Sequence, residues 1–200
     1  MEWVLAGPKL QRCRTTFLDQ ALPVDSALLV GEGNGRFLSE LLKRSPQTKV
    51  LFIDSSARML DCARLRLQKQ KLPVDGVTFI HENILQWSAP GQKFDLVVTH
   101  FFLDCFQPKQ LQILIPRLAG IAKPGTRWLL ADFQLPKAGW KKFRAQCVLT
   151  LMYWFFRWTT QLPARYLACP DSLLQKNGFL LQQRRQFEWE LLKSDLWVNQ

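Results

Sequence analysis

The sequence lacks the features that mark membrane-spanning and secreted proteins. No stretch approaches the roughly 18 to 20 consecutive apolar residues that a membrane-spanning helix requires. The first residues, 1–6, contain no basic region and too short an apolar run for a secretory signal. We therefore expect a cytoplasmic protein without a transmembrane segment.

Cysteine and histidine are too few and too scattered for a disulfide framework or a zinc site. The five cysteines are widely spaced and form no C-x-x-C pair, and there are only two histidines. This pattern is typical of reduced thiols in the cytoplasm, and it predicts no bound metal. The cysteines are Cys13, Cys62, Cys105, Cys147 and Cys169.

Acidic residues are in the minority. Lysine and arginine number 27 against 16 aspartates and glutamates, giving a net charge of +11. Such a surface attracts nucleic acid, anionic lipid or an acidic partner, but an ordinary solvated basic surface explains the balance equally well. Basic residues occur throughout the chain, so no segment resembles a dedicated nucleic-acid arm.

The sequence contains no internal repeat, low-complexity tract or Ser/Gly linker, and 200 residues suit a single domain. We therefore expect one domain over 1–200. A polar, basic stretch at 9–20 predicts a helix that ends before Leu22-Pro23, which makes 1–23 an N-terminal helical segment.

Short apolar runs then alternate with segments of helical spacing. Strands are predicted at 27–30, 49–54, 76–80, 94–99 and 127–131. Apolar positions at helical spacing follow the first two strands, with Ser55 or Ser56 as the cap of the second helix, and another helix is expected at 108–122. Strands that are apolar on both faces and alternate with helices predict a parallel sheet covered on both sides.

The C-terminal part breaks this alternation. The sequence predicts two neighbouring strands, at 178–189 and 191–198, and therefore a terminal antiparallel hairpin. The expected fold is α/β: a Rossmann-like, doubly wound, mostly parallel seven-stranded sheet with a C-terminal antiparallel hairpin and helices on both faces.

A glycine loop follows the first strand directly and opens a helix. Gly31, Gly33 and Gly35 allow a tight turn and the close approach of a ligand to the backbone. Asp54 ends the next strand 19 residues after Gly35, near the spacing of about 20 for an acid that binds a ribose diol. Strand, loop, helix and acid together predict a nucleoside site.

The alternative ligand for this loop is a nicotinamide or flavin dinucleotide. A dinucleotide site needs a loop without negative charge, because the pyrophosphate lies at the helix N-terminus. Glu32 stands inside this loop, and the glycine spacing is G-x-G-x-G instead of G-x-G-x-x-G. Both features favour S-adenosylmethionine, which has no phosphate and carries two positive charges.

Five segments in order resemble the motifs of class I S-adenosylmethionine-dependent methyltransferases, and the resemblance covers roughly residues 24–190. They are 28–35 around the glycine loop, 52–60 around Asp54, 79–83 after the third strand, 93–98 in the fourth strand, and 122–126 before the fifth. An ordered set of this kind is far more specific than a single motif.

The resemblance implies a role for each matching position. Gly31, Gly33 and Gly35 would pass beneath the methionine moiety, and Asp54 would hold the ribose. Ser55 and Met59 would lie beside the adenine, Asn83 would meet its amino group with Ile84 adjacent, and Thr99 and His100 would line the methionine end. The family's usual acid two residues before the first glycine is replaced here by Leu29. Glu32 either substitutes for it at the methionine ammonium or points to solvent.

Two residues after the fourth strand are candidates for a general base, His100 and Asp104. Methyl transfer needs one only when the acceptor arrives protonated, and positioning supplies most of the catalysis otherwise. A histidine at a strand end is as often structural, and Asp104 could equally cap the next helical turn. Residues 100–102 also lack the Asn/Asp-Pro-Pro-aromatic motif of enzymes that methylate adenine N6 or glutamine.

The most apolar segment is 148–156, which has basic residues on both sides and lies within a predicted helical insertion at 136–170. One interpretation is a helix that packs on the sheet and covers the site; the other is a lid that admits a lipophilic acceptor or rests on an anionic membrane on its inner face. A looser similarity to methyltransferases of quinone biosynthesis favours a small aromatic or lipophilic acceptor. A nucleic acid is the second choice, and a catalytically silent binding module is the third.

Overall fold

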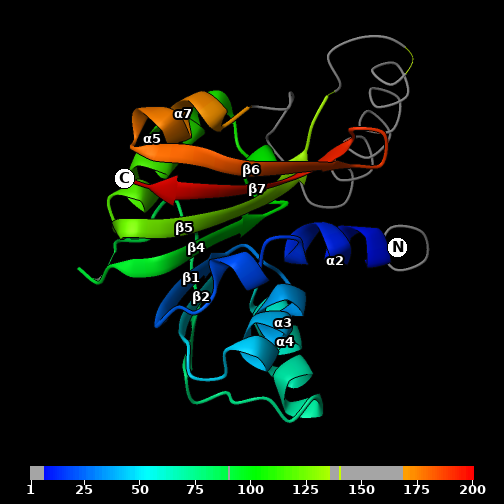
Figure 1. Cartoon of the computed structure of the whole chain (residues 1–200). Helices are drawn as coiled ribbons and strands as arrows, with labels where there is room; N and C mark the ends of the chain where they lie inside the picture. The colour runs from blue at the N-terminus through cyan, green and yellow to red at the C-terminus, as the bar shows by residue number, and fades with distance from the viewer. Residues whose placement is uncertain (1–6, 90, 136–139, 141–168) are drawn as a thin grey trace.

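The computed structural model describes residues 7–89, 91–135, 140 and 169–200 (Figure 1). Seven strands form one sheet in the order β3-β2-β1-β4-β5-β7-β6. β1 to β5 run parallel, whereas β7 pairs antiparallel with both β5 and β6. The strands are β1 (Ser26–Val30), β2 (Lys49–Asp54), β3 (Val77–His81), β4 (Phe94–His100), β5 (Ala122–Phe133), β6 (Phe179–Phe187) and β7 (Leu192–Asn199).

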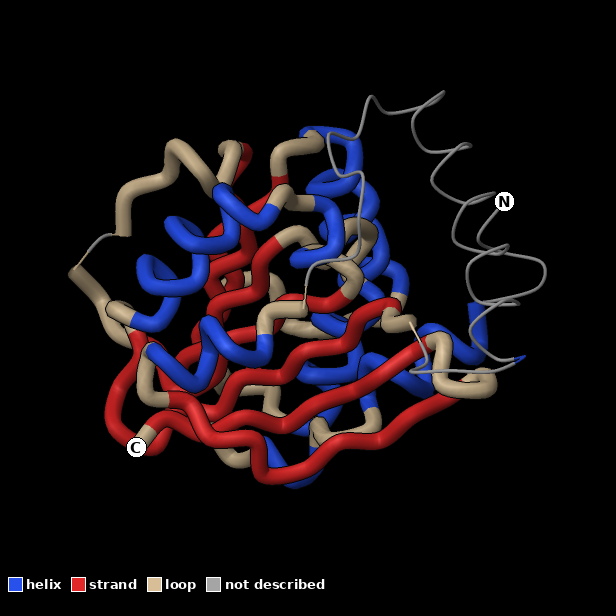
Figure 2. The backbone as a smooth tube through the Cα atoms, turned by 90° about the horizontal axis from the view of Figure 1, so that it is seen from above, coloured by secondary structure: helices blue, strands red, loops and turns tan. Residues whose placement is uncertain are grey.

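Helices cover both faces of the sheet (Figures 1 and 2). One face carries α2 (Gly7–Thr15), α3 (Arg36–Arg44) and α4 (Ala57–Lys69). The other carries α5 (Pro108–Ala119) and α7 (Asp171–Lys176). Two short 3-10 helices, η1 (Asp19–Ala21) and η2 (Leu103–Cys105), complete the described elements.

The core has two layers because the inner strands are buried on both sides. In β1, for example, Leu28 packs with the α5 and α7 layer and Leu29 with the α3 and α4 layer, each fully buried. Trp128 and Trp197 lie opposite each other on β5 and β7 and fill the first of these layers. Burial on both faces explains why the inner strands read as continuous apolar runs.

The predicted fold class is confirmed, together with the C-terminal hairpin. The expected helix at 108–122 is too long: α5 ends at Ala119, and Ala122 already pairs with Phe94 in the sheet. Likewise the expected helix at 9–20 is divided into α2 and η1. The predicted insertion at 136–170, including the apolar run 148–156, lies almost wholly outside the described residues.

Candidate functional site

The three glycines of the loop serve different purposes. All have positive φ: 62° at Gly31, 75° at Gly33 and 74° at Gly35. A Cβ on Gly31 would lie 1.9 Å from the Phe102 ring, and one on Gly35 would lie 2.8 Å from Ala63 Cβ. At Gly33, in contrast, the nearest atom would be Met59 Sδ at 4.0 Å. Packing therefore requires the outer glycines, and the open approach to the backbone is at Gly33.

Asp54 connects the end of β2 with the glycine loop. Its Oδ2 accepts a hydrogen bond from Gly33 N (3.1 Å), and its Oδ1 accepts one from Ser56 N (2.9 Å). The side chain is buried, and burial raises the pKa of this carboxyl above its ordinary value. Ser56, not Ser55, caps α4 by accepting from Met59 N (3.4 Å).

Glu32 turns inward and does not point to solvent, being only 5% exposed. Its Oε1 accepts a hydrogen bond from Phe37 N (2.8 Å) and so caps α3, because Gly35 has no side chain to do so. Its Oε2 is buried without a hydrogen-bond partner among the described residues. Burial raises the pKa of Glu32 to about 7, although the positive charge of Arg14 lowers it in part.

The residues expected around adenine lie at the ends of β2 and β3. Met59 is 39% exposed and Asn83 is also exposed, whereas Ile84 is buried. The Ser55 carbonyl oxygen accepts a hydrogen bond from His81 Nε2 (3.0 Å), which links the two strand ends. This hydrogen bond keeps the ends of β2 and β3 together beside Asp54.

Thr99 and His100, at the end of β4, are both enclosed. Thr99 is fully buried, and its hydroxyl accepts a hydrogen bond from Trp128 Nε1 (2.8 Å) on β5. His100 meets the ring of Phe37 edge-on, with the ring centroids 4.6 Å apart. Burial and the charge of Arg14 lower the pKa of His100 well below its ordinary value, so the imidazole is neutral.

Asp104 has a partner that the sequence did not indicate. It lies in η2, and its carboxyl group lies close to that of Asp132 at the end of β5. Burial raises the pKa of Asp104 to about 6, and burial together with the Asp104 charge raises the pKa of Asp132 well above its ordinary value. Two adjacent buried carboxyl groups cannot both ionise easily, so this pair retains one proton near neutral pH.

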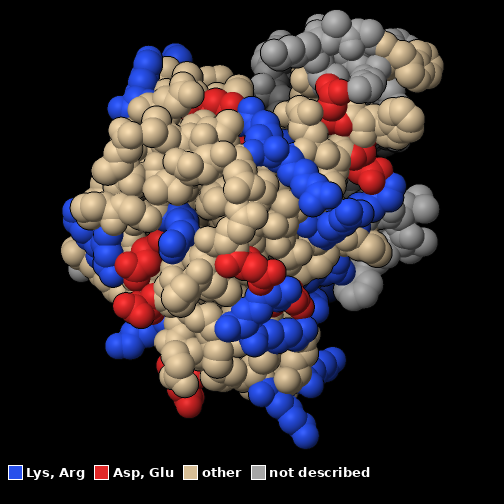
Figure 3. Space-filling model, in the orientation of Figure 1, with Lys and Arg blue, Asp and Glu red and all other residues tan. Residues whose placement is uncertain are grey.

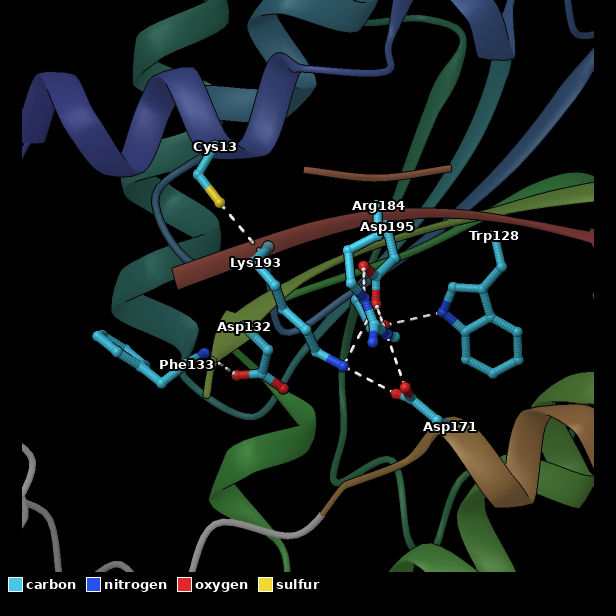
Figure 4. Close-up of polar contacts among 9 residues, drawn as sticks. Cys13, Trp128, Asp132, Phe133, Asp171, Arg184, Lys193 and Asp195 are labelled. Atoms are coloured by element: carbon cyan, nitrogen blue, oxygen red, sulfur yellow. Dashed lines mark hydrogen bonds and ion pairs between the residues drawn. The ribbon is translucent and has the colours of Figure 1, made fainter. Parts of the chain in front are cut away.

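A cluster of ion pairs, in which Lys193 and Asp195 are buried, lies next to Asp132 (Figure 4). Lys193 Nζ contacts Asp171 Oδ1 at 2.8 Å and Asp195 Oδ2 at 3.3 Å. Arg184 bridges the same two aspartates, with contacts of 2.7 Å to each. β6, β7 and the first turn of α7 are thereby joined beside β5. We call Asp171, Arg184, Lys193 and Asp195 the ionic cluster.

On the face seen in Figure 3, lysine and arginine form a diagonal band from the upper centre to the right and several smaller groups elsewhere, with acidic residues near both. Within the described ranges, no three His, Cys, Asp or Glu side chains could hold a metal ion together. The helices described are also all too short or too polar to cross a bilayer.

Residues 27–125 match a family model described as a methyltransferase domain. A release factor glutamine methyltransferase of Rhodopirellula baltica is 30% identical over 78 residues, which is 39% of this chain and 26% of that protein. The chain thus spans about a quarter of the length of this curated relative.

Solved structures share the fold over nearly the whole chain. The N-methyltransferase NodS of Bradyrhizobium japonicum has a TM-score of 0.65 at 16% identity, with 96% of this chain and 93% of that chain covered. Magnesium protoporphyrin IX methyltransferase of Synechocystis, solved with S-adenosylhomocysteine, has a TM-score of 0.68 at 21% identity, with 95% and 83% covered. The mitomycin 7-O-methyltransferase MmcR gives 0.66 at 15%, with 93% and 55% covered.

Proposed function

Because the chain belongs to the class I S-adenosylmethionine-dependent methyltransferases, we propose that it binds S-adenosylmethionine along the carboxyl ends of β1, β2 and β3 and methylates a small acceptor. One observation carries the proposal: the Asp54 carboxylate is bonded to Gly33 N, at the only loop glycine with open space above it. An acid at the end of the second strand can accept hydrogen bonds from a ribose diol.

The loop chemistry suits a cationic ligand better than a pyrophosphate. A pyrophosphate needs the free N–H groups at the start of the helix, and Glu32 already takes the one on Phe37. The carboxylate would also repel the phosphates, whereas its second oxygen has no partner among the described residues and suits an ammonium group. We propose that Glu32 substitutes here for the acid missing at Leu29.

The remaining donor contacts follow from this arrangement. Gly31 and Gly35 shape the loop, and Asp54 holds the ribose. Ser55 after β2, Met59 on α4, and Asn83 and the buried Ile84 after β3 border the base. Thr99 lines the methionine end of the donor site with its backbone, because its hydroxyl group is hydrogen-bonded to Trp128.

Bound S-adenosylmethionine supplies a methyl group already activated by a positively charged sulfur. The chain itself must orient the acceptor, exclude water and, where the acceptor is protonated, take up its proton. We assign this last task to Asp104 in preference to His100. The Asp104–Asp132 pair retains one proton near neutral pH, and its remaining carboxylate can take up another.

We propose a small aromatic or lipophilic acceptor. Phenylalanines follow β4 directly, and the rings of Phe102 and Phe106 pack edge to face 4.9 Å apart beside Gly31. Two of the structural neighbours are named as methyltransferases of a porphyrin and of mitomycin.

Isothermal titration calorimetry with S-adenosylhomocysteine tests the donor site. We expect saturable binding below millimolar concentration, and a loss of affinity of about 100-fold in Asp54→Ala, because hydrogen bonds to a buried carboxylate are lost. The matched control is Asp61→Ala on α4, whose carboxylate is exposed and pairs only with the nearby Arg64. Absence of binding to the unaltered chain would refute the proposed function.

A further inference from the structure

The glycine loop is fastened to a helix that is not part of it. Arg66 on α4 donates from Nε to the carbonyl oxygen of Asn34 (2.8 Å), the residue between Gly33 and Gly35. One turn earlier on the same helix, Ala63 lies directly against the loop, because a Cβ on Gly35 would be 2.8 Å from its Cβ and 2.9 Å from its Cα. The guanidinium thus adds a polar contact where the loop backbone already packs on the helix.

A contact at this peptide matters because glycines flank it on both sides. Gly33 and Gly35 have φ of 75° and 74°. Glycine has more backbone freedom than any other residue, so the Asn34 peptide could turn if nothing held it. Gly33 N also donates to Asp54 Oδ2 (3.1 Å). The loop is therefore held at two points, by Asp54 at the end of β2 and by Arg66 on α4.

The charge of Arg66 also acts on the buried carboxyl group of Glu32. Burial raises the pKa of Glu32, whereas the charges of Arg14 on α2 and Arg66 on α4 and the first backbone N–H groups of α3 lower it in part. His100 at the end of β4, which packs on Phe37, is neutral and adds no charge. The Arg66 cation therefore favours the ionised form of Glu32.

We propose that Arg66 is a positioning residue of the donor site, which holds the Asn34 peptide so that the loop keeps the conformation a ligand meets at Gly33. This inference rests on the proposed function. A loop already held in its binding conformation loses less conformational entropy when the ligand binds, so the contact raises affinity. Arg66 acts through the loop backbone and through Glu32, and it needs no contact of its own with the ligand.

Two substitutions of Arg66 separate the hydrogen bond from the charge. Arg66→Met removes both, whereas Arg66→Gln places an amide NH2 group at the same number of bonds from the backbone as the arginine Nε and removes only the charge. We expect Arg66→Met to bind S-adenosylhomocysteine about 10-fold more weakly by calorimetry at pH 8, since a charge-assisted hydrogen bond is lost. Arg66→Gln should regain most of this loss.

The matched control is Arg64→Met on the same helix. It removes a guanidinium that pairs with Asp61 (3.0 Å) and lies over the Phe79 ring (4.6 Å to the centroid), away from the glycine loop. This variant should bind S-adenosylhomocysteine as the unaltered chain does.

The pH dependence of binding supplies a readout that the stability of α4 alone would not change. Under the proposed function the ionised form of Glu32 binds the ligand ammonium, so the affinity of the unaltered chain should rise between about pH 6 and 8, around the Glu32 pKa of about 7. Loss of the Arg66 charge raises that pKa further. Both Arg66 variants should therefore reach their full affinity only at higher pH.

Three results would overturn the inference while leaving the proposed function intact. They are Arg66→Met binding as tightly as Arg64→Met, Arg66→Gln binding no better than Arg66→Met at pH 8, and a pH profile that both variants share with the unaltered chain. Failure of the unaltered chain to bind S-adenosylhomocysteine would overturn the proposed function as well.

Discussion

The two halves of the sheet's carboxyl edge are stabilised by different kinds of contact. At the ends of β1 and β2, each carboxylate is bound by backbone N–H groups: Asp54 by Gly33 and Ser56, and Glu32 by Phe37. At the ends of β4 and β5, carboxyl groups and cations bind one another instead, in the Asp104–Asp132 pair and in the ionic cluster. The donor half depends on local backbone geometry and the other half on packing between distant elements.

This difference indicates which residues of the sheet edge can be substituted one at a time. A carboxylate held by the backbone needs only its own residue and the right turn, so the donor half can be retained as a short motif. A buried ion pair needs both partners, because removing one leaves an uncompensated charge in the interior. In the half at β4 and β5, several residues would therefore have to change together.

The largest effect is expected from breaking the ionic cluster. Lys193→Met should lower the free energy of unfolding by about 3 kcal/mol, because Asp195 is fully buried and Asp171 loses a partner. Lys43→Met, in an exposed pair with Glu40 on α3, should cost about 0.5 kcal/mol or less. Urea unfolding of both variants measures the difference, and equal losses would contradict the distinction between the two kinds of ion pair.

A smaller effect is expected within the glycine loop, where one substitution at two positions should act differently. Gly31→Ala should destabilise the protein by about 2 kcal/mol, since its φ is 62° and the new Cβ meets the Phe102 ring. Gly33→Ala should cost about 1 kcal/mol through its φ of 75° alone, yet weaken binding of S-adenosylhomocysteine. Thermal unfolding and calorimetry together measure both effects. Adding Phe102→Ala to Gly31→Ala should restore part of the stability, and no restoration would exclude the ring as the cause.

The smallest expected effect concerns pH. Both carboxyl groups of the Asp104–Asp132 pair have raised pKa values in the folded chain, about 6 for Asp104. Their contribution to stability is therefore fully present below about pH 4 and is lost as the pH rises through 6. Asp132→Asn should flatten this decline and leave the variant about 1 kcal/mol more stable than the unaltered chain at pH 8. Melting temperatures from pH 4 to 8 provide the measurement; an equally steep decline in the variant would argue against a shared proton.

The elements that the sequence predicts well are those whose signals are local. The expected strand at 49–54 matches β2, and Ser56 caps α4 as one of the two serines proposed. The predicted end of α5 is wrong because Lys123-Pro124-Gly125 looks like a helix stop, whereas Ala122 already pairs with Phe94 in the sheet. Pairing with a neighbouring strand cannot be read from the residues themselves.

The same limit applies to the site. Gly31, Gly33, Gly35 and Asp54 could be found because their spacing in the chain fixes their arrangement. Asp132 was missed because its partner Asp104 comes from another strand end, and only strand order brings the two together. The capping of α3 by Glu32 was missed as well, since an acid in a glycine loop gives no local sign that it will cap the following helix.

The hairpin formed by β6 and β7 contacts the chain on both sides of residues 136–168. Gln134, just beyond β5, donates to the Leu191 carbonyl oxygen (2.9 Å), and Asp171, at the start of α7, pairs with Lys193. The described residues on either side of 136–168 are therefore both attached to the same hairpin. A segment of different length or sequence could be grafted between these points without altering the strand register. Under the proposed function, such a graft would leave unchanged the strand ends proposed to bind the methyl donor.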